Sequence, residues 1–240
     1  MSLPDIYGFN KSSEAGQNEF AASLFLLGCN LRCPYCMNKK LVSEEMWEPG
    51  KPLSTIPWNT VKDQIKKDDI KEVMISGGEP TYRREDELLN LIMALKELGC
   101  KVGLSTNGTF PEILNSVISH LFYVAMDYKG VNEDGIYEGD GFYAVLRSKC
   151  ILMSAKQARK DFDYELRTTL CPTHITKDVL KAIGKSLFPN ERWVFQQYRK
   201  TPNMLDPGKL EDVIPYSMEE INDLIKIAKM YTNNTEMRYV

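Results

Sequence analysis

Short runs of apolar residues alternate with longer amphipathic stretches along most of the chain. The run KEVMISG, at residues 71–77, is largely apolar, as is typical of a strand covered on both faces. Residues 83–98 instead carry leucine and isoleucine at helical spacing, with acidic residues in the first turn and a glycine after the last. The same reasoning predicts strands at residues 22–28, 71–77, 101–107, 122–129, 163–170 and 192–199, and helices at residues 58–68, 83–98, 111–119, 142–159, 176–187 and 217–231.

The predicted order is a strand followed by a helix, repeated about six times. Strands joined by single helices pair in parallel through right-handed crossovers. The pattern therefore predicts an α/β fold, which is either an open, partial barrel or a doubly wound sheet. We expect one domain over residues 1–240, with a core at about 20–200, because the proline-rich stretch 43–57 is typical of a surface connection. A last helix at about 217–231 follows that core.

Composition narrows the partners and the location of the protein. The chain has 30 basic and 33 acidic residues, and the basic residues do not gather into a run, so we expect no nucleic-acid partner. No apolar stretch approaches the length of a membrane span, and the first residues, MSLPDIYGFNKSSEAG, lack the regions of a secretory signal. We therefore expect a cytoplasmic protein without a membrane partner, whose thiols stay reduced.

The segment GCNLRCPYCMN places Cys29, Cys33 and Cys36 within eight positions. Three thiolates are an incomplete set for structural zinc, which takes four ligands, and neither of the chain's two histidines lies at a metal-ligand spacing from them. Iron–sulfur clusters usually take four cysteines, so three would leave one iron open to another ligand. Structural zinc and a chance gathering of reduced cysteines are the alternatives.

The other three cysteines are far apart in the sequence. Cys100 follows a predicted helix end and Cys150 stands among apolar residues, so we expect both to be small core residues. Cys171 follows the fifth predicted strand, and we expect no chemical role for its thiol.

Polar residues gather where the predicted strands end. Both candidate folds place their chemistry at the carboxyl ends of parallel strands. One cavity at this end would collect the cysteine segment, the GGEP and STNG segments, Asp127, Lys129, Arg167 and the QQYR segment.

The spacing CxxxCxxC, with Tyr35 before the last cysteine, resembles the signature of the radical S-adenosylmethionine (AdoMet) enzymes. In that superfamily three cysteines hold a four-iron, four-sulfur (4Fe-4S) cluster, and the amine and carboxylate of AdoMet bind the fourth iron. The resemblance implies that Cys29, Cys33 and Cys36 hold one such cluster as the catalytic centre, and that AdoMet fills the open position. It also implies a partial (β/α)6 TIM-like barrel.

The resemblance further implies AdoMet contacts at the strand ends. Gly77, Gly78 and Glu79 resemble the GGE segment, whose backbone and glutamate contact the methionine amine; by itself the segment would be a turn. Asp127 and Lys129 resemble an acidic and basic pair near the methionine group, with the lysine on its carboxylate. The alternative for this pair is a salt bridge at a surface strand end.

Three more positions are implied in the same way. Arg167 resembles an arginine that approaches AdoMet from the fifth strand; its alternative is an ion pair with Glu165, which shares its face. Ser105 and Asn107 would reach the ribose hydroxyls, or would act as turn and capping residues. Tyr35 would lie beside the cofactor.

Several segments occur in the order seen in activating enzymes for glycyl radical enzymes, and they resemble most closely the activating proteins of anaerobic ribonucleoside-triphosphate reductase. These segments are LLGCNLRCPYCMN, ISGGEPT, STNGT, VAMDYKG, YELRTTLCP and VFQQYR. The resemblance implies an oxidoreductase that works under anaerobic conditions. An electron from a flavodoxin- or ferredoxin-like donor would cleave AdoMet to methionine and a 5'-deoxyadenosyl radical, which would take a hydrogen from a glycine of the partner enzyme.

The sequence departs from that group at two positions near the cofactors, since Met37 stands where histidine is common and Ser105 stands where an acidic residue is common. No further cysteine-rich block follows, so we expect no auxiliary cluster. Two alternatives stay open for the function. One is a radical AdoMet enzyme acting on a small molecule, such as 7-carboxy-7-deazaguanine synthase, and the other is a non-catalytic metal-binding scaffold.

Overall fold

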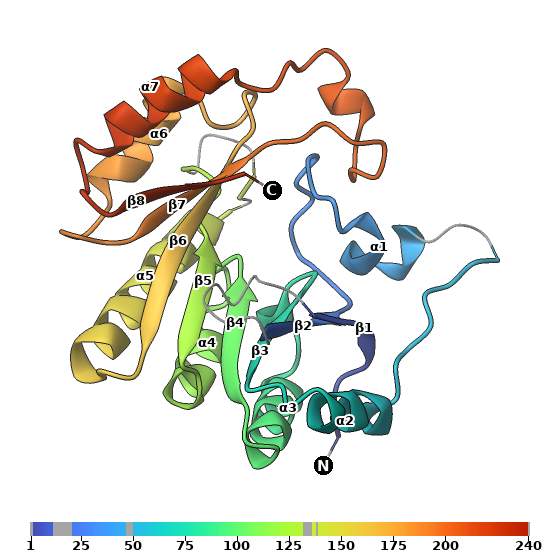
Figure 1. Ribbon diagram of the computed structural model, residues 1–240. Helices are drawn as coiled ribbons and strands as arrows, with labels where there is room; N and C mark the ends of the chain where they lie inside the picture. Colours follow the sequence, from blue (N-terminus) through green and yellow to red (C-terminus); the bar gives the residue numbers. More distant parts are fainter. Residues whose placement is uncertain (1, 12–20, 47–49, 132–135, 138, 240) are drawn as a thin grey trace.

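The strands form one curved sheet in which each strand lies beside its neighbours in the sequence (Figure 1). The computed structural model describes residues 2–11, 21–46, 50–131, 136–137 and 139–239. The first two strands are antiparallel, and all the later pairs are parallel. The strands are β1 (Ile6–Lys11), β2 (Ala21–Leu26), β3 (Glu72–Gly77), β4 (Lys101–Thr106), β5 (Tyr123–Asp127), β6 (Asp163–Leu170), β7 (Trp193–Gln197) and β8 (Thr235–Arg238).

The six expected strands are confirmed as β2 to β7, and the sheet extends beyond them at both ends. Sequence reasoning missed β1 and β8. Strand β8 reads TEMR and strand β1 reads IYGFNK, and neither contains an apolar run, because both form edges of the sheet and are covered less completely than the strands between them.

The helices lie on the outer face of the curved sheet (Figure 1). The parallel strands follow one another in the sheet in the same order as in the sequence, and this order never reverses, as it does in a doubly wound sheet. Right-handed crossovers therefore place every connecting helix on the same face of the sheet. The structure is therefore the partial barrel. The helices are α1 (Lys39–Val42), α2 (Trp58–Lys67), α3 (Glu85–Glu97), α4 (Pro111–Val117), α5 (Gly141–Ala158), α6 (Lys177–Lys185) and α7 (Met218–Ala228), with single 3-10 turns at Glu44–Met46, Pro80–Tyr82, Ile118–His120 and Gly208–Leu210. The six expected helices are confirmed as α2 to α7. In the described part of the chain, the single turn α1 is the one α-helix that was not expected.

The apolar core lies between the sheet and these helices. Leu24, Ile75 and Leu104 on the strands, and Leu91 and Leu95 on α3, are fully buried and belong to one continuous cluster. Burial of such side chains is the main contribution that holds the layers together. No helix in the described residues is long and apolar enough to cross a membrane.

The two cysteines expected in the core differ. Cys100 is buried, as expected, but Cys150 is exposed, so that expectation was wrong. Helix α5 turns Val145, Lys149 and Leu152 inward, and Cys150 falls between these positions on the outer side.

The sheet does not close on itself, because its order begins at β1 and ends at β8 and these two edge strands are not paired. The carboxyl ends of the parallel strands β2 to β7 meet at one rim of this open barrel. That rim positions the site described next.

Candidate active site

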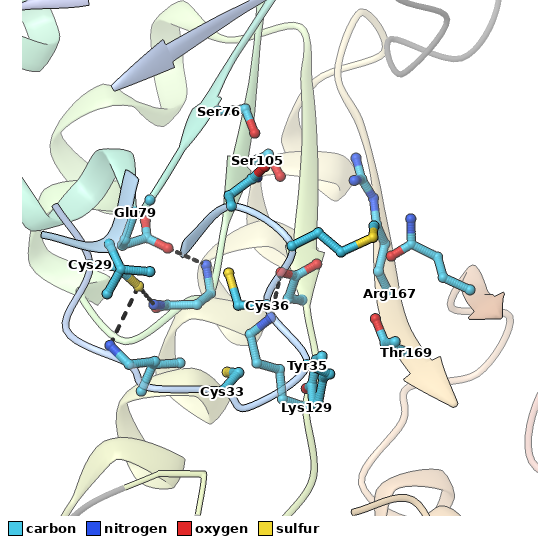
Figure 2. A pocket seen from close by; sticks show the side chains of 18 of the residues that line it. Cys29, Cys33, Tyr35, Cys36, Ser76, Glu79, Ser105, Lys129, Arg167 and Thr169 are labelled. Carbon is cyan, nitrogen blue, oxygen red and sulfur yellow. Dashed lines mark hydrogen bonds and ion pairs between the residues drawn. The ribbon is translucent and has the colours of Figure 1, made fainter. Parts of the chain in front are cut away.

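A cavity of about 330 Å³ lies at the carboxyl ends of the strands (Figure 2). All twelve residues expected at the site line it: Cys29, Cys33, Tyr35, Cys36, Gly77, Gly78, Glu79, Ser105, Asn107, Asp127, Lys129 and Arg167. They come from the segment after β2 and from the ends of β3, β4, β5 and β6. The expectation that one cavity collects them is confirmed.

The cysteine segment is held by backbone hydrogen bonds of the protein itself. Gly28 N–H donates to the carbonyl of Leu41 at 2.8 Å, and Cys29 N–H donates to that of Val42 at 3.0 Å. Within the segment, the N–H of Leu31 donates to Cys29 Sγ at 3.4 Å. Hydrogen bonds of the chain itself therefore help to hold the loop that carries the thiols.

A second support comes from the segment between β7 and α7, residues 201–213, which we call the crossover segment. Leu205 N–H donates to the carbonyl of Cys36 at 2.9 Å, and Asp206 N–H donates to that of Pro34 at 3.1 Å. Met204 is fully buried in the same segment. Figure 1 shows this part of the chain beside α1, although the two lie far apart in the sequence. The sequence carries no periodic signal for this contact, and sequence reasoning missed it.

Replacing Met204 by alanine should loosen the cysteine segment. Truncation of a fully buried methionine costs about 2–5 kcal/mol, and here the cavity would open beneath the backbone that holds Pro34 and Cys36. We expect iron bound by the three cysteines to pass to a chelator several times faster than from the unchanged protein. Met218→Ala, at a methionine that is 51% exposed, is the control; equal rates of iron loss in both variants would contradict the supporting role.

The paired glycines at the end of β3 allow the cysteine segment to approach the sheet. A Cβ on Gly77 would lie 2.2 Å from the carbonyl oxygen of Leu26, and one on Gly78 would lie 2.2 Å from that of Gly28. Gly77 also has φ = +126°, which side chains rarely adopt. Gly77 thus makes room for the backbone at the end of β2, and Gly78 makes room for the backbone of Gly28 and Leu41.

The Glu79 carboxylate is engaged by neighbouring groups of the protein. It accepts hydrogen bonds from Thr81 N–H at 2.9 Å, from the hydroxyls of Thr81 and Thr106 at 2.6 and 2.7 Å, and from Asn107 N–H. Burial raises the pKa of Glu79 despite these donors. Glu79 thus joins the ends of β3 and β4, and its bond from Thr81 N–H agrees with the turn named as the alternative. Its contact with a methionine amine stays a prediction.

Asn107 lies next to the cysteine segment. Its side-chain amide donates to Asn30 Oδ1 at 3.0 Å and lies 4.0 Å from Cys29 Sγ, and its Oδ1 accepts from Thr109 N–H at 3.0 Å. The last bond is the turn arrangement named as its alternative. Ser105 lines the cavity.

Asp127 and Lys129 form an ion pair of 2.7 Å between Oδ2 and Nζ. The alternative of an exposed surface pair does not hold, since the side chains are only 30% and 15% exposed and both line the cavity. Burial alone would lower the pKa of Lys129, but the charges of Asp127 and the Cys33 thiolate raise it above its ordinary value. Tyr35 and Tyr137 pack around the pair, and Tyr137 accepts the hydrogen bond of Lys129 N–H at 2.9 Å.

Arg167 combines both of its expected arrangements. Its Nε donates to Glu165 Oε1 at 2.9 Å, which is the ion pair named as the alternative. The same side chain lines the cavity, and its Nη2 is buried without a hydrogen-bond partner. Figure 2 shows Arg167 and Thr169 across the cavity from the cysteines. Thr169 was missed, although its position two residues after Arg167 on β6 places it on the same face.

Met37, where the resemblance favours histidine, lines the cavity and is 55% exposed. A thioether supplies no N–H donor. The hydrogen bond that a histidine would give to a cluster has no counterpart from this side chain.

The residues present fit a 4Fe-4S cluster with AdoMet. In the described part of the chain, no three Cys, His, Asp or Glu side chains are close enough to share one metal ion. A cubane cluster does not need that arrangement, because each thiolate binds a different iron. Burial, followed by the charge of Glu79, raises the pKa of Cys29 to about 12, so cluster insertion must displace its proton. The unpartnered Arg167 nitrogen, buried at the cavity, suits a carboxylate such as that of AdoMet.

Comparison with known proteins agrees with this geometry. The family model described as "Radical SAM superfamily" matches residues 23–151. A protein of Methanocaldococcus jannaschii, named provisionally as a glycyl-radical enzyme activating enzyme, is 29% identical over 233 residues, which are 92% of this chain and 89% of the relative. The 7-carboxy-7-deazaguanine synthase of Hyperthermus butylicus is 40% identical over 86 residues, which are 36% of this chain and 34% of that enzyme.

Among solved structures, QueE of Escherichia coli superimposes with a TM-score of 0.56 at 15% identity. The match covers 99% of this chain and 92% of that chain. At this identity the likeness concerns the fold, and it agrees with the single α/β domain described above.

Proposed function

The chain belongs to the radical SAM superfamily, and from this premise we propose that it is an activating enzyme that generates a glycyl radical on a partner enzyme, namely anaerobic ribonucleotide reductase. When bound, the 4Fe-4S cluster and AdoMet supply the radical chemistry: one electron from a flavodoxin- or ferredoxin-like donor breaks a carbon–sulfur bond of AdoMet, which leaves methionine and a 5'-deoxyadenosyl radical that takes a hydrogen atom from a glycine Cα. We place this reaction in the cytoplasm under anaerobic conditions.

The residues of the chain would hold and orient these groups. Cys29, Cys33 and Cys36 would bind three irons of the cluster, and the backbone at the GGE segment would meet the methionine amine. Lys129 and Arg167 would bind the carboxylate of AdoMet, because both are cationic groups that line the cavity. Ser105 and Asn107 would face the ribose, and Asp127 would hold Lys129 in place through their ion pair.

The observation that carries the proposal is the similarity to the M. jannaschii relative, which extends over 92% of this chain. The similarity to 7-carboxy-7-deazaguanine synthase supports a small-molecule substrate instead, but it extends over only 36% of the chain. The open sheet favours a macromolecular substrate, because a loop of a partner protein can reach the rim of a barrel whose edge strands are not joined. A scaffold without catalysis would have no use for a buried arginine nitrogen left unpartnered at the cavity.

Electron paramagnetic resonance tests the proposal directly. Candidate reductase would be incubated anaerobically with the cluster-loaded protein, AdoMet and a one-electron reductant. We expect the doublet of a glycyl radical, with 5'-deoxyadenosine formed in proportion, and neither with Cys33→Ala. If 5'-deoxyadenosine forms while a competent reductase gives no doublet, the small-molecule alternative replaces the proposal. If no 5'-deoxyadenosine forms at all, both are wrong.

A further inference from the structure

Arg238 on β8 reaches across β7 and binds the carboxylate of Glu165 on β6. Glu165 is fully buried, and its two oxygens accept from Arg238 Nη1 at 2.6 Å and from Arg238 Nη2 at 2.8 Å. Two parallel bonds between a guanidinium and a carboxylate form the strongest and most directional kind of ion pair in proteins. Both oxygens of Glu165 are thus occupied by a residue from the edge of the sheet.

The same carboxylate fixes Arg167 by a single bond. Only Nε of Arg167 donates to Glu165, at 2.9 Å, and Nη2 stays buried without a partner beside the cavity. A guanidinium held at Nε keeps its terminal nitrogens available for a second acceptor. The arrangement therefore presents Arg167 to the cavity and keeps it in one orientation.

The charges of the ion pairs around Glu165 do not cancel. Arg167, Arg192 and Arg238 contribute three positive charges, while Glu165 and Glu236 contribute two negative charges, which leaves one positive charge in excess. The neighbouring pair of Asp127 and Lys129 is neutral and satisfied within itself. The excess charge, together with the unpartnered nitrogen of Arg167, favours an anionic group of a ligand bound in the cavity.

We propose that Arg238 is a positioning residue for carboxylate binding: its two bonds hold Glu165 in an orientation that Arg167 reaches through Nε alone, and this leaves the terminal nitrogens of Arg167 to the carboxylate of AdoMet. This inference rests on the AdoMet site proposed above and not on the identity of the partner enzyme. Without Arg238, Glu165 is free to turn onto Arg167 and to compete with the ligand.

Equilibrium dialysis of labelled AdoMet against the oxidised, cluster-loaded protein tests this without turnover, because no electron is supplied. Arg238→Ala should raise the Kd for AdoMet about tenfold, as expected for the loss of one charge-assisted hydrogen bond to the ligand. Arg238→Lys should raise it less, since a single ammonium covers one oxygen at a time. The matched control is Arg192→Ala: Arg192 binds Glu236 at 2.6 Å, as Arg238 does at 2.8 Å, but stays 3.7 Å from Glu165, so its removal should change Kd by less than about twofold.

A double variant separates positioning from a merely structural role. Adding Glu165→Gln to Arg238→Ala removes the competing negative charge, so the double variant should bind AdoMet more tightly than Arg238→Ala alone. An unchanged Kd in a folded, cluster-loaded Arg238→Ala protein would overturn the inference, as would an equal rise in Arg192→Ala or a weaker double variant. If Arg238→Ala does not fold, the same comparison is made with Arg238→Lys. AdoMet binding that responds as expected, without a glycyl radical on the reductase, would leave this inference standing while the proposed partner falls.

Discussion

Cys33→Ala should lose its iron–sulfur cluster and form 5'-deoxyadenosine at least about a thousandfold more slowly than the unchanged protein, which corresponds to about 4 kcal/mol of activation free energy. Cys33 is the most buried of the three clustered thiols, and burial raises its pKa although the charge of Lys129 opposes this, so coordination to a metal would favour its thiolate form. Alanine leaves one iron without a protein ligand. The measurements are iron and sulfide content after anaerobic reconstitution, and 5'-deoxyadenosine formed with AdoMet and a reductant.

Cys100→Ala is the matched control for this substitution. Cys100 is buried to nearly the same degree, 5% against 7% exposed, but it lies at the opposite end of β4 and lines no part of the cavity. Its thiol donates to the carbonyl of Ile70 at 3.3 Å, so the control should lose only modest stability and should keep its cluster. Equal cluster content in Cys33→Ala and Cys100→Ala would remove Cys33 from the metal site.

Gly77→Ala should strongly destabilise the fold, because a side chain at this position has no room. The new Cβ would lie 2.2 Å from the carbonyl oxygen and 2.3 Å from the nitrogen of Leu26, and the backbone would be held at φ = +126°. Left-handed strain costs about 1–3 kcal/mol, and relieving a backbone clash adds about 1–3 kcal/mol. We therefore expect a loss of about 2–6 kcal/mol, with a fall in Tm of roughly 4–24 °C for a chain of this size.

Gly99→Ala separates the two contributions. Gly99 also has a positive φ, +83°, but a Cβ there meets nothing within 4 Å. This variant should lose about 1–2 kcal/mol, the cost of the strain alone. Thermal unfolding of both proteins without the cluster measures the difference. If the two substitutions lower Tm equally, the close approach of β3 to Leu26 is not what requires glycine.

Much of this architecture could be predicted because the parallel strands are covered on both faces, so their apolar runs stand out in the sequence. The site followed from the strands, since parallel pairing brings the polar residues after β2 to β6 to one rim. The edge strands β1 and β8 could not be found in this way, because partial exposure leaves their sequences mixed. The contact of Arg238 with Glu165 was hidden for the same reason: it depends on β8 and on a pairing between residues 73 positions apart.

Other parts of the site depend on geometry that no spacing reveals. Glu79 and Arg167 were predicted as ligand contacts from the resemblance to the radical AdoMet enzymes, and the structure adds the protein partners that hold them. Glu79 is engaged by threonines of two segments, while Arg167 keeps an unpartnered nitrogen. Whether a charged side chain stays available to a ligand depends on its neighbours in the folded protein. The sequence of one segment does not reveal those neighbours.

The hydrogen bonds around the cysteine segment also bear on how the enzyme matures. Small zinc domains fold only as the metal binds, since the metal organises the loops that bind it. Here the carbonyls of Leu41, Val42, Pro34 and Cys36 are already paired with backbone N–H groups, so the loop takes shape with the rest of the barrel. We therefore expect iron and sulfide to be delivered late, to a loop that is already folded, and we expect a cluster lost to oxygen to be rebuilt without unfolding of the chain.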